Sequence, residues 1–384
     1  MTGTGTRETL RIPGPTPVPP EVVAAMGREM ISHRGAEFRA FYTDLLGLVR
    51  RAHRTEHDVL IWPGSGSAGW ESVVVNLFSP GDPVLATVCG DFGHRFAGVA
   101  ETFGLDVERL EVPWGRAVTP EGVAKALARR PGTKAVFIAY NETSTALTNP
   151  LPEIARVVRE HGALVVVDAV SAAGGLPLET DAWGVDVVLS GSQKAWMCPP
   201  GLLLMAIGPR AWAAHENARF PRFFWDWTAA RRQAEQGMTP TTPPLSLLFG
   251  LDAALRMIFA EEIEATWARH ATLGEMVRAD LLGRGLRLFP DPAHASNTVT
   301  GFRPPEGIAA RAVVAAVRER HGIALEAGKG ATVDSVVRLG HMGWVHEPEM
   351  RLALDAIGES VEWLVAGSAA AAPAMAGSGV REFG

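Results

Sequence analysis

Two residues that follow predicted strands have side chains suited to covalent and acid–base chemistry. Lys194 stands just past the strand predicted at 186–192, among small residues, aromatics and prolines. A lysine amine that loses its proton on desolvation acts as a nucleophile or base, whereas arginine does not. Asp168 ends the β-branched run at 165–168, so its carboxylate leaves a buried strand and needs a cationic partner. A solvated loop lysine is the alternative at position 194.

Lysine is rare in this chain. Only four of the 36 basic residues are lysines, and they are Lys125, Lys134, Lys194 and Lys329. Of these four, Lys194 alone stands among small residues, aromatics and prolines rather than on a charged helical face. Where arginine carries nearly all of the positive charge, a lysine at a strand end favours a role that needs an amine.

A loop of small residues follows the first strong strand prediction. The segment PGSGSAGWE (63–71) joins a strand to a helix, and backbone N–H groups at such a helix start bind anions. The segment also matches the dinucleotide pattern G-x-G-x-x-G through Gly64, Gly66 and Gly69, with Asp91 at the end of the next predicted strand. A phosphate-binding loop is predicted, and a dinucleotide site or a simple packing turn remains open.

Aromatic and polar groups follow the neighbouring strands. Phe92 stands between glycines in GDFGHR (90–95), where a ring stacks on a flat ligand or is simply part-buried. The segment YNETSTALTNP (140–150) groups hydroxyls and an amide that orient a ring substituent or form turns. An anion loop, a stacking ring, an aspartate and a nucleophilic lysine together are what pyridoxal 5′-phosphate requires. The aspartate keeps its pyridine nitrogen protonated, and the lysine bonds its aldehyde.

The candidate residues follow strands of a predicted open α/β sheet. Seven apolar runs of strand length lie at 58–63, 83–88, 107–112, 134–140, 163–169, 186–192 and 201–208. Helical stretches separate most of them, which predicts parallel neighbours with helices on both faces. Ligands of such sheets bind outside the carboxyl ends of the strands, so the candidates are expected at one edge.

The alternation of predicted strands and helices along the sequence changes after residue 209. A long helical pattern from about 247 to 284 precedes strand candidates at 297–302 and 335–341, with a helix at 310–320 between them. Four segments are predicted: an extended N-terminal segment (1–20), a large domain (21–264), a smaller α+β domain (265–366) and a flexible tail (367–384).

Composition narrows the class of protein. The 384 residues are 47% hydrophobic with a net charge of −6, which is typical of a globular protein and argues against a nucleic-acid-binding surface. Cys89 and Cys198 are too few and too far apart for a disulfide framework or a metal site. The start of the chain lacks signal-peptide features, and no apolar run reaches transmembrane length. A soluble, cytoplasmic protein is expected.

Several motifs in order resemble the class V aminotransferases, fold-type I pyridoxal-phosphate enzymes that include alanine–glyoxylate and serine–glyoxylate (serine–pyruvate) aminotransferases. The motifs run from GPTPVPPEV (14–22) through SHRGAEF, GSGSAGWE, GDFGHR, NETSTAL, VVVDAVSA and GSQKAWMCPPG to RLGHMG (338–343). The resemblance implies a large domain with a mostly parallel seven-stranded sheet and a smaller α+β C-terminal domain. It also implies a homodimer with active sites at the subunit interface.

The resemblance further implies roles for individual residues. Lys194 forms the Schiff base with the cofactor, Asp168 pairs with its pyridine nitrogen, and Arg338 binds the carboxylate of the amino-acid substrate. The implied cofactor-binding set is Ser65, Gly66, Ser67, Ala68, Phe92, Thr143, Asp168, Val170, Gln193 and Lys194, with Thr242 reaching the phosphate from the second subunit.

The implied reaction moves an amino group from alanine or serine to a 2-oxo acid such as glyoxylate or pyruvate. Arg338 is one carboxylate clamp, and the sequence offers no clear second arginine for a dicarboxylic side chain. A pyridoxamine–pyruvate aminotransferase, whose G-[KR]-G turn is similar to residues 328–330, and other class V aminotransferases are alternatives. Cysteine desulfurases differ by a histidine where this chain has Gln193. A nicotinamide-dependent oxidoreductase leaves Lys194 and Asp168 unexplained.

Overall fold

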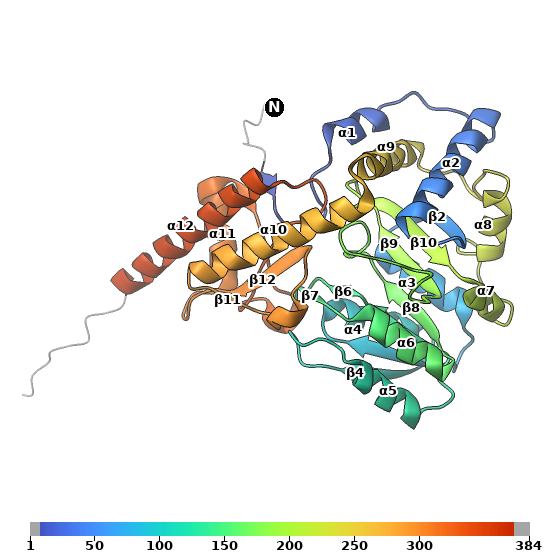
Figure 1. Cartoon of the computed structure of the whole chain (residues 1–384), viewed down its shortest axis with the longest axis horizontal. Coiled ribbons are helices and arrows are strands. Elements are labelled where there is room, and N and C mark those ends of the chain that lie inside the picture. Colours follow the sequence, from blue (N-terminus) through green and yellow to red (C-terminus); the bar gives the residue numbers. More distant parts are fainter. Residues whose placement is uncertain (1–7, 372–384) are drawn as a thin grey trace, which may run out of the picture.

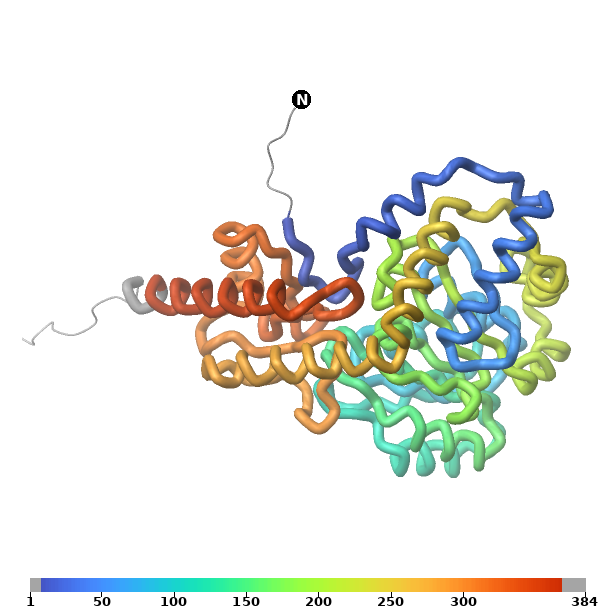
Figure 2. Tube along the Cα trace, turned by 45° about the horizontal axis from the view of Figure 1, so that its top comes forward, coloured from blue at the N-terminus to red at the C-terminus, as the bar shows by residue number. Residues whose placement is uncertain are grey.

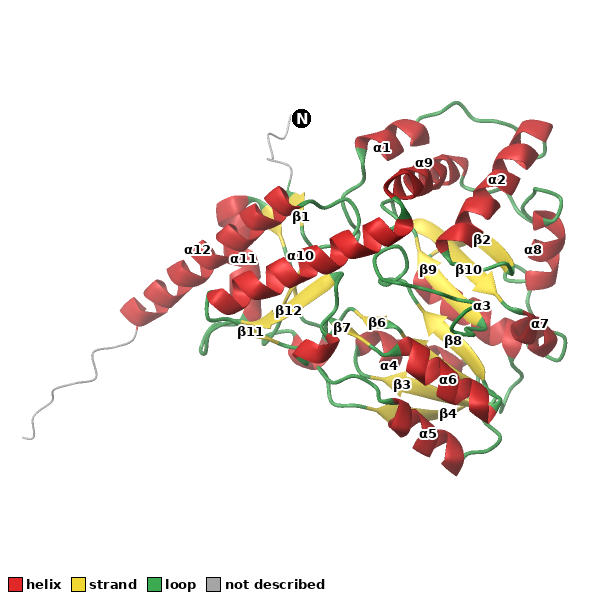
Figure 3. Ribbon diagram, in the orientation of Figure 1, coloured by secondary structure: helices red, strands yellow, loops and turns green. Residues whose placement is uncertain are grey.

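A seven-stranded sheet forms the centre of the larger part of the molecule (Figures 1 and 3). The computed structural model describes residues 8–371. In spatial order the strands are β2 (Asp58–Gly64), β10 (Gly201–Ile207), β9 (Val187–Gly191), β8 (Leu164–Asp168), β5 (Ala135–Ala139), β3 (Pro83–Val88) and β4 (Asp106–Glu111). Neighbours are parallel except that β10 pairs antiparallel with β2 and β9. The predicted fold class and all seven strands are confirmed.

The inner strands are apolar throughout because their side chains alternate between two cores. Val165 and Val167 of β8 face one core, whereas Leu164 and Val166 face the other. Complete burial of such a side chain stabilises the fold by about 1.5–3 kcal/mol. Helices that contribute to the first core are α2 (Ala36–Ala52), α5 (Pro120–Arg129), α6 (Leu151–His161), α9 (Leu245–Glu261) and the start of α10 (Ile263–Gly283). Those of the second are α3 (Gly66–Leu77), α4 (Asp91–Thr102), α7 (Pro209–His215) and α8 (Trp227–Ala234).

A separate core holds the C-terminal part together. Its helices are α10 (Ile263–Gly283), α11 (Ala310–His321) and α12 (Glu347–Ala371). They pack against an antiparallel sheet of order β11 (Arg287–Leu288), β12 (Val299–Arg303), β15 (Val337–Gly340) and β14 (Glu326–Ala327). Figure 2 shows α10 and α12 running side by side, away from the large sheet.

The predicted long helix around 247–284 is two helices, which corrects the sequence interpretation. The chain breaks at Glu262, whose φ of 73° lies in the left-handed region and ends α9 before α10 begins. The predicted domain boundary after residue 264 lies beside this break and stays a prediction. Helix α12 continues to Ala371, past the predicted start of the tail at 367, and residues 1–7 and 372–384 lie outside the described residues.

The N-terminal segment connects the two parts of the molecule. Strand β1 (Thr9–Leu10) pairs in parallel with β13 (Ile323–Ala324), beside the small core. The Thr16 N–H then donates to the Gln193 carbonyl across 3.1 Å. In Figure 1 this segment runs between the C-terminal part and the large sheet before α1 (Pro20–Met26) begins. The segment therefore crosses the loop that carries Lys194.

Candidate active site

The carboxyl ends of the strands border a cavity of about 120 Å³. Its lining residues are Ser65, Gly66, Ser67, Trp70, Phe92, Asn141, Thr143, Asp168, Val170, Ser171, Gln193 and Lys194. The structure thus brings together all of the predicted cofactor-binding residues except Ala68 and Thr242. Their convergence follows from the topology, since β2, β3, β5, β8 and β9 all end at this edge.

Ala68 and Thr242 are the two exceptions. Ala68 is on α3 beside Gly64 and is not among the lining residues. The Thr242 side chain is exposed on the segment before α9, outside the cavity of its own chain. Trp70, Asn141 and Ser171, in contrast, line the cavity although they were not singled out from the sequence. All three fall inside the motifs already noted, and only their side-chain direction was missing.

The anion-binding loop is the uncapped start of α3. Ser65 is the N-cap residue without a side-chain cap, and the first helical hydrogen bond runs from Gly69 N–H to the Ser65 carbonyl across 3.1 Å. The N–H groups of Gly66, Ser67 and Ala68 therefore lack partners within the helix. Together with the positive end of the helix dipole, these N–H groups form a cradle suited to a phosphate.

Glycine at position 66 lets a phosphate come close to the backbone, and the close packing of the loop also requires it. A Cβ at this position would collide with Cγ2 of Val170, a stiff β-branched side chain. We expect Gly66→Ala to weaken pyridoxal-phosphate binding by about 5- to 150-fold, the equivalent of the 1–3 kcal/mol that overpacking costs. Fluorescence titration measures this affinity.

A second substitution tests the cause. In Gly66→Ala/Val170→Ala the collision is removed, and most of the affinity should return. Gly98→Ala on α4 is the matched control, because a Cβ there meets no atom within 4 Å. Equal affinities for the double and single variants would contradict the packing explanation.

Asp168 is held with both carboxylate oxygens occupied. The Trp70 indole N–H donates to Oδ2 across 2.9 Å, and the Val170 N–H donates to Oδ1 across 2.8 Å. The side chain is 6% exposed. Burial raises the pKa of Asp168 to about 6, against the effect of these two hydrogen bonds. A cationic ligand group in the cavity would supply the missing opposite charge.

Lys194 lies in the loop after β9, only 9% exposed. Its Nζ donates to the Pro13 carbonyl, and its own carbonyl accepts from the Thr16 hydroxyl across 2.9 Å. Burial is the main reason that the pKa of Lys194 falls to about 8. The amine is therefore close to losing its proton at physiological pH, which arginine could not do.

Charged residues near Lys194 affect the pKa of its amine, so the pH dependence of its reaction can be tested. Glu326 raises the pKa of Lys194, whereas Arg338 and Lys329 lower it. Because the neutral amine reacts, the rate at which the protein captures pyridoxal phosphate should rise with pH and reach half its maximum near pH 8. Stopped-flow absorbance measures the rate.

Two charge variants should move that midpoint in opposite directions. Glu326→Gln removes a negative charge and should shift it to lower pH, and Lys329→Met removes a positive charge and should shift it to higher pH. Coincident pH profiles for the three proteins would contradict the electrostatic explanation.

Phe92 lies in the first turn of α4 beside the cavity, and Glu142 holds its backbone. The buried Glu142 carboxylate accepts from the Phe92 N–H across 3.1 Å and from the Gly93 N–H across 3.0 Å. It also accepts from the Ser144 N–H across 3.1 Å. Thr143, the residue after Glu142, donates from its hydroxyl to Ser171 Oγ across 2.6 Å. The 140–150 segment therefore positions both the Phe92 ring and the hydroxyl groups on the polar side of the cavity.

Arg338, from β15, reaches the same region from the C-terminal part of the chain. Its guanidinium is 2% exposed and pairs with the Glu326 carboxylate across 2.6 Å. It also donates to the Ala327 carbonyl across 2.9 and 3.0 Å, and to the Thr143 carbonyl across 3.4 Å. A substrate carboxylate on Arg338 would take the place that Glu326 occupies.

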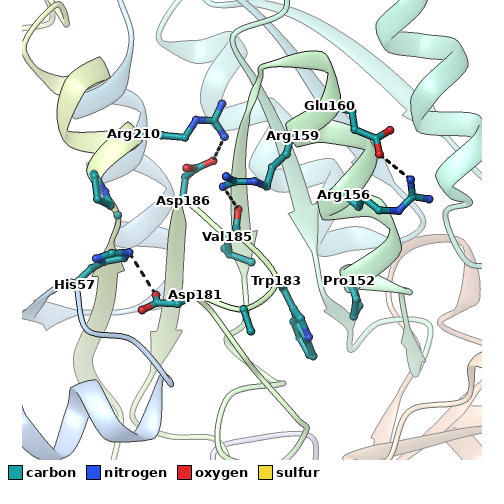
Figure 4. Close-up of a pocket in the computed structure, with 14 residues that line it drawn as sticks. His57, Pro152, Arg156, Arg159, Glu160, Asp181, Trp183, Val185, Asp186 and Arg210 are labelled. Carbon is teal, nitrogen blue, oxygen red and sulfur yellow. Dashed lines mark hydrogen bonds and ion pairs between the residues drawn. The ribbon is translucent and has the colours of Figure 1, made fainter.

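A larger open cavity of about 850 Å³ lies at the opposite edge of the sheet (Figure 4). Most of its charged groups face a partner of opposite charge, including Arg210 with Asp186 across 3.1 Å and His57 with Asp181 across 3.6 Å. No group of three or more His, Cys, Asp or Glu side chains within residues 8–371 is placed to hold a metal ion. The chemistry predicted from the sequence therefore belongs to the smaller cavity.

The mostly parallel seven-stranded sheet with a smaller C-terminal part defines a fold-type I transferase. The chain belongs to the class V aminotransferases, since that family matches residues 10–346. It is 36% identical to the serine–glyoxylate aminotransferase of Methylorubrum extorquens, covering 89% of this chain and 88% of that one. It is 37% identical to the small subunit of a soluble hydrogenase from Synechococcus, covering 91% of both.

A solved structure gives the same assignment. The aspartate aminotransferase of Thermus thermophilus superposes with a TM-score of 0.86 and 33% identity, covering 92% of this chain and 99% of that one. The predicted family is confirmed and the chain is a transaminase. The nicotinamide-dependent alternative, which rested on the glycine pattern of 64–69, loses its support.

Proposed function

We propose that this transaminase uses pyridoxal 5′-phosphate and moves an amino group from alanine or serine to a 2-oxo acid such as glyoxylate or pyruvate. The observation that carries the proposal is the burial of Lys194 and Asp168 in one cavity, next to the uncapped start of α3. A serine–glyoxylate aminotransferase is among the similar proteins, which supports the choice of donor and acceptor.

The residues present fit the cofactor. The N–H groups of Gly66 and Ser67 suit its phosphate, Asp168 suits its pyridine nitrogen, and Phe92 offers a ring to stack on its own. Gln193 Oε1 is buried in the cavity wall and has no hydrogen-bond partner among residues 8–371. Since a side-chain amide presents either its oxygen or its nitrogen by rotation, Gln193 has a free polar group for the ligand.

Each residue has a definable task in the reaction. When bound, pyridoxal phosphate supplies an aldehyde that takes up the amino group and a ring that draws electrons from the substrate Cα–H bond. The negative charge of Asp168 holds a proton on the ring nitrogen. Arg338 would orient the substrate by its carboxylate, and the neutral Nζ of Lys194 would remove the Cα proton and deliver it to the former aldehyde carbon of the cofactor, so that the amino group stays with the cofactor. Burial lowers the pKa of Lys194 far enough for this step.

A half-reaction screen tests the function. The protein is loaded with pyridoxal phosphate, and its visible absorption is followed on addition of single amino acids. Alanine or serine should bleach the band, and glyoxylate or pyruvate should restore it. A loaded protein that responds to no amino acid would contradict the proposal, and so would a protein that takes up no pyridoxal phosphate.

We further propose that the active form is a homodimer in which Thr242 of one subunit reaches the phosphate site of the other. Thr242 is exposed and outside the cavity of its own chain. Large apolar side chains are also exposed, among them Phe223 at 94%, Met30 at 59% and Val23 at 58%. Sedimentation equilibrium should give twice the chain mass, and a monomer with full activity would contradict the proposal.

The cytoplasmic location stays a prediction. Within residues 8–371, no helix has both the length and the apolar character needed to cross a bilayer.

A further inference from the structure

The loop at 341–346, between β15 and α12, packs against the backbone of Lys194. Gly343 in this loop (the Gly343 loop) has a φ of 75°, which lies in the left-handed region that favours glycine. A Cβ built on Gly343 would lie 3.2 Å from the Lys194 carbonyl oxygen and 3.2 Å from Thr16 Oγ1. The same carbonyl accepts from the Thr16 hydroxyl across 2.9 Å. The Gly343 loop therefore supports the peptide group of the residue that carries the reactive amine.

His270 of α10 holds the Gly343 loop through an acceptor nitrogen. Its side chain is completely buried, with Nδ1 2.7 Å from the Thr266 carbonyl oxygen and Nε2 2.9 Å from the Gly343 nitrogen. Because a carbonyl only accepts and a backbone N–H only donates, Nδ1 carries the proton and Nε2 accepts from Gly343. Burial lowers the pKa of His270 to about 4, so the ring is neutral and Nε2 is free to accept.

Arg269, the preceding residue of α10, holds the other polar group of the same glycine. Its guanidinium donates to the carbonyls of Gly343 and Val345, each across 3.2 Å. It also pairs with the Glu261 carboxylate across 2.7 Å. Consecutive residues of one helix thus bind both the N–H and the C=O of Gly343. The position of the Gly343 loop against Lys194 is consequently set by α10.

His270 also meets the segment around Lys194 by direct packing. A Cβ at Gly175 would lie 3.2 Å from the Ala195 Cβ and 3.5 Å from His270 Cδ2. The imidazole and the residue that follows Lys194 therefore pack against the same glycine. His270 is not one of the residues that line the active-site cavity, so its influence on the reaction has to pass through these neighbours.

We propose that His270 is a positioning residue for the reactive amine. By accepting from the Gly343 N–H it fixes the loop that supports the Lys194 carbonyl, and so it fixes the direction in which the lysine side chain leaves the backbone. This inference rests on the proposed function of Lys194 and deepens it. Because a displacement of about 1 Å of a reacting group costs on the order of 100-fold in rate, a support outside the cavity is enough to control the reaction.

Two substitutions separate the acceptor nitrogen from the rest of the ring. The side-chain amide of His270→Gln reaches the position of Nε2 and can accept from Gly343, whereas that of His270→Asn reaches only the position of Nδ1. The measured quantity is the first-order rate of covalent capture by the full-length, cofactor-free protein at saturating pyridoxal phosphate. In this step the Lys194 amine bonds the aldehyde carbon and water is lost. We expect His270→Asn to slow capture about 10- to 100-fold and His270→Gln to stay within about threefold.

Non-covalent binding distinguishes positioning of the amine from a general loss of structure. Pyridoxine 5′-phosphate has an alcohol in place of the aldehyde, so it occupies the site without bonding to Lys194. Calorimetric titration should find its affinity for His270→Asn within about twofold of that for the unmodified protein. In the cofactor-loaded protein the same variant should lower kcat and leave KM within about twofold.

A second buried histidine is the matched control. His215 is 4% exposed, and its ring nitrogens lie 3.0 Å from the Asn76 carbonyl oxygen and 2.8 Å from Thr228 Oγ1. His215→Asn should lower stability without slowing capture, because its contacts lie in the second core of the large sheet.

A further variant loosens the Gly343 loop from its carbonyl side. Arg269→Met removes the donor to Gly343 at a partly exposed position, where the chain should still fold. We expect it to slow capture about 3- to 10-fold, the usual effect of one lost hydrogen bond.

The outcomes separate the two proposals. A protein that captures pyridoxal phosphate but transaminates no amino acid would overturn the proposed function, and the capture rates would still decide the role of His270. Capture by His270→Asn within about twofold of the unmodified rate would overturn the positioning role, and so would equal slowing in His270→Gln. If His270→Asn does not fold, an unchanged capture rate in Arg269→Met would overturn it.

Discussion

Replacement of Lys194 by alanine is expected to abolish turnover. The substitution removes both the nucleophile and the base of the proposed reaction, so we expect kcat/KM to fall by on the order of 10⁴-fold. The visible band of the bound cofactor should change or disappear, because its covalent attachment is lost. Fold and stability should persist, since the Lys194 side chain makes one hydrogen bond within the described part of the chain, to the Pro13 carbonyl. Steady-state assays and absorbance spectra measure these effects.

Arginine at position 194 is the more informative variant. Lys194→Arg keeps the positive charge but cannot lose its proton, so it should be as inactive as Lys194→Ala. Lys125→Ala on the exposed face of α5 controls for the loss of a lysine as such. Activity in Lys194→Arg within tenfold of the unmodified protein would refute the role of a neutral amine.

Replacement of Asp168 by asparagine is expected to reduce kcat/KM by on the order of 10²–10³-fold, as the loss of one preorganised electrostatic group does. The isosteric amide fills the same space but has no charge to hold a proton on the pyridine nitrogen. Cofactor affinity should fall as well, because the cavity then lacks the negative charge that would pair with the protonated pyridine nitrogen. Both quantities can be measured on the same preparation by titration and by single-turnover kinetics.

The pH dependence of cofactor affinity tests the role of the Asp168 charge specifically. Burial raises the pKa of Asp168 to about 6, so the carboxylate is ionised above that pH and protonated below it. Pyridoxal-phosphate affinity should therefore decline as the pH falls through about 6 in the unmodified protein, and this step should be absent in Asp168→Asn. The stability of the cofactor-free protein should depend on pH in the opposite direction. Its free energy of unfolding should fall as the pH rises from the pKa of Asp168 in the unfolded chain towards 6, because the folded protein disfavours the ionised carboxylate.

A second buried aspartate serves as the control. Asp186 accepts from the Val165 N–H across 2.8 Å and pairs with Arg210, but at the opposite edge of the sheet. Asp186→Asn should affect stability without changing cofactor affinity. An equal loss of affinity in both variants would mean that the effect of Asp168→Asn is a general loss of structure.

Parts of the site followed from the sequence because they depend on local patterns. Apolar runs of strand length identified all seven strands, and the residues just after them had to meet at one edge of a parallel sheet. Asp168 and Lys194 were predictable for this reason. The break at Glu262 was not, because an apolar helical period continues across it while a single left-handed residue ends α9.

The sequence alone determined which side chains could do chemistry: a lysine where arginine prevails, an aspartate at the end of a buried strand and a glycine–serine loop at a helix start. Only the tertiary structure decided what those groups face. Pro13 meets Lys194, Glu326 engages Arg338 and Lys329 stands over Phe92. These contacts join segments far apart in the chain, and their geometry depends on how the C-terminal part packs against the large sheet. No local periodicity encodes that packing.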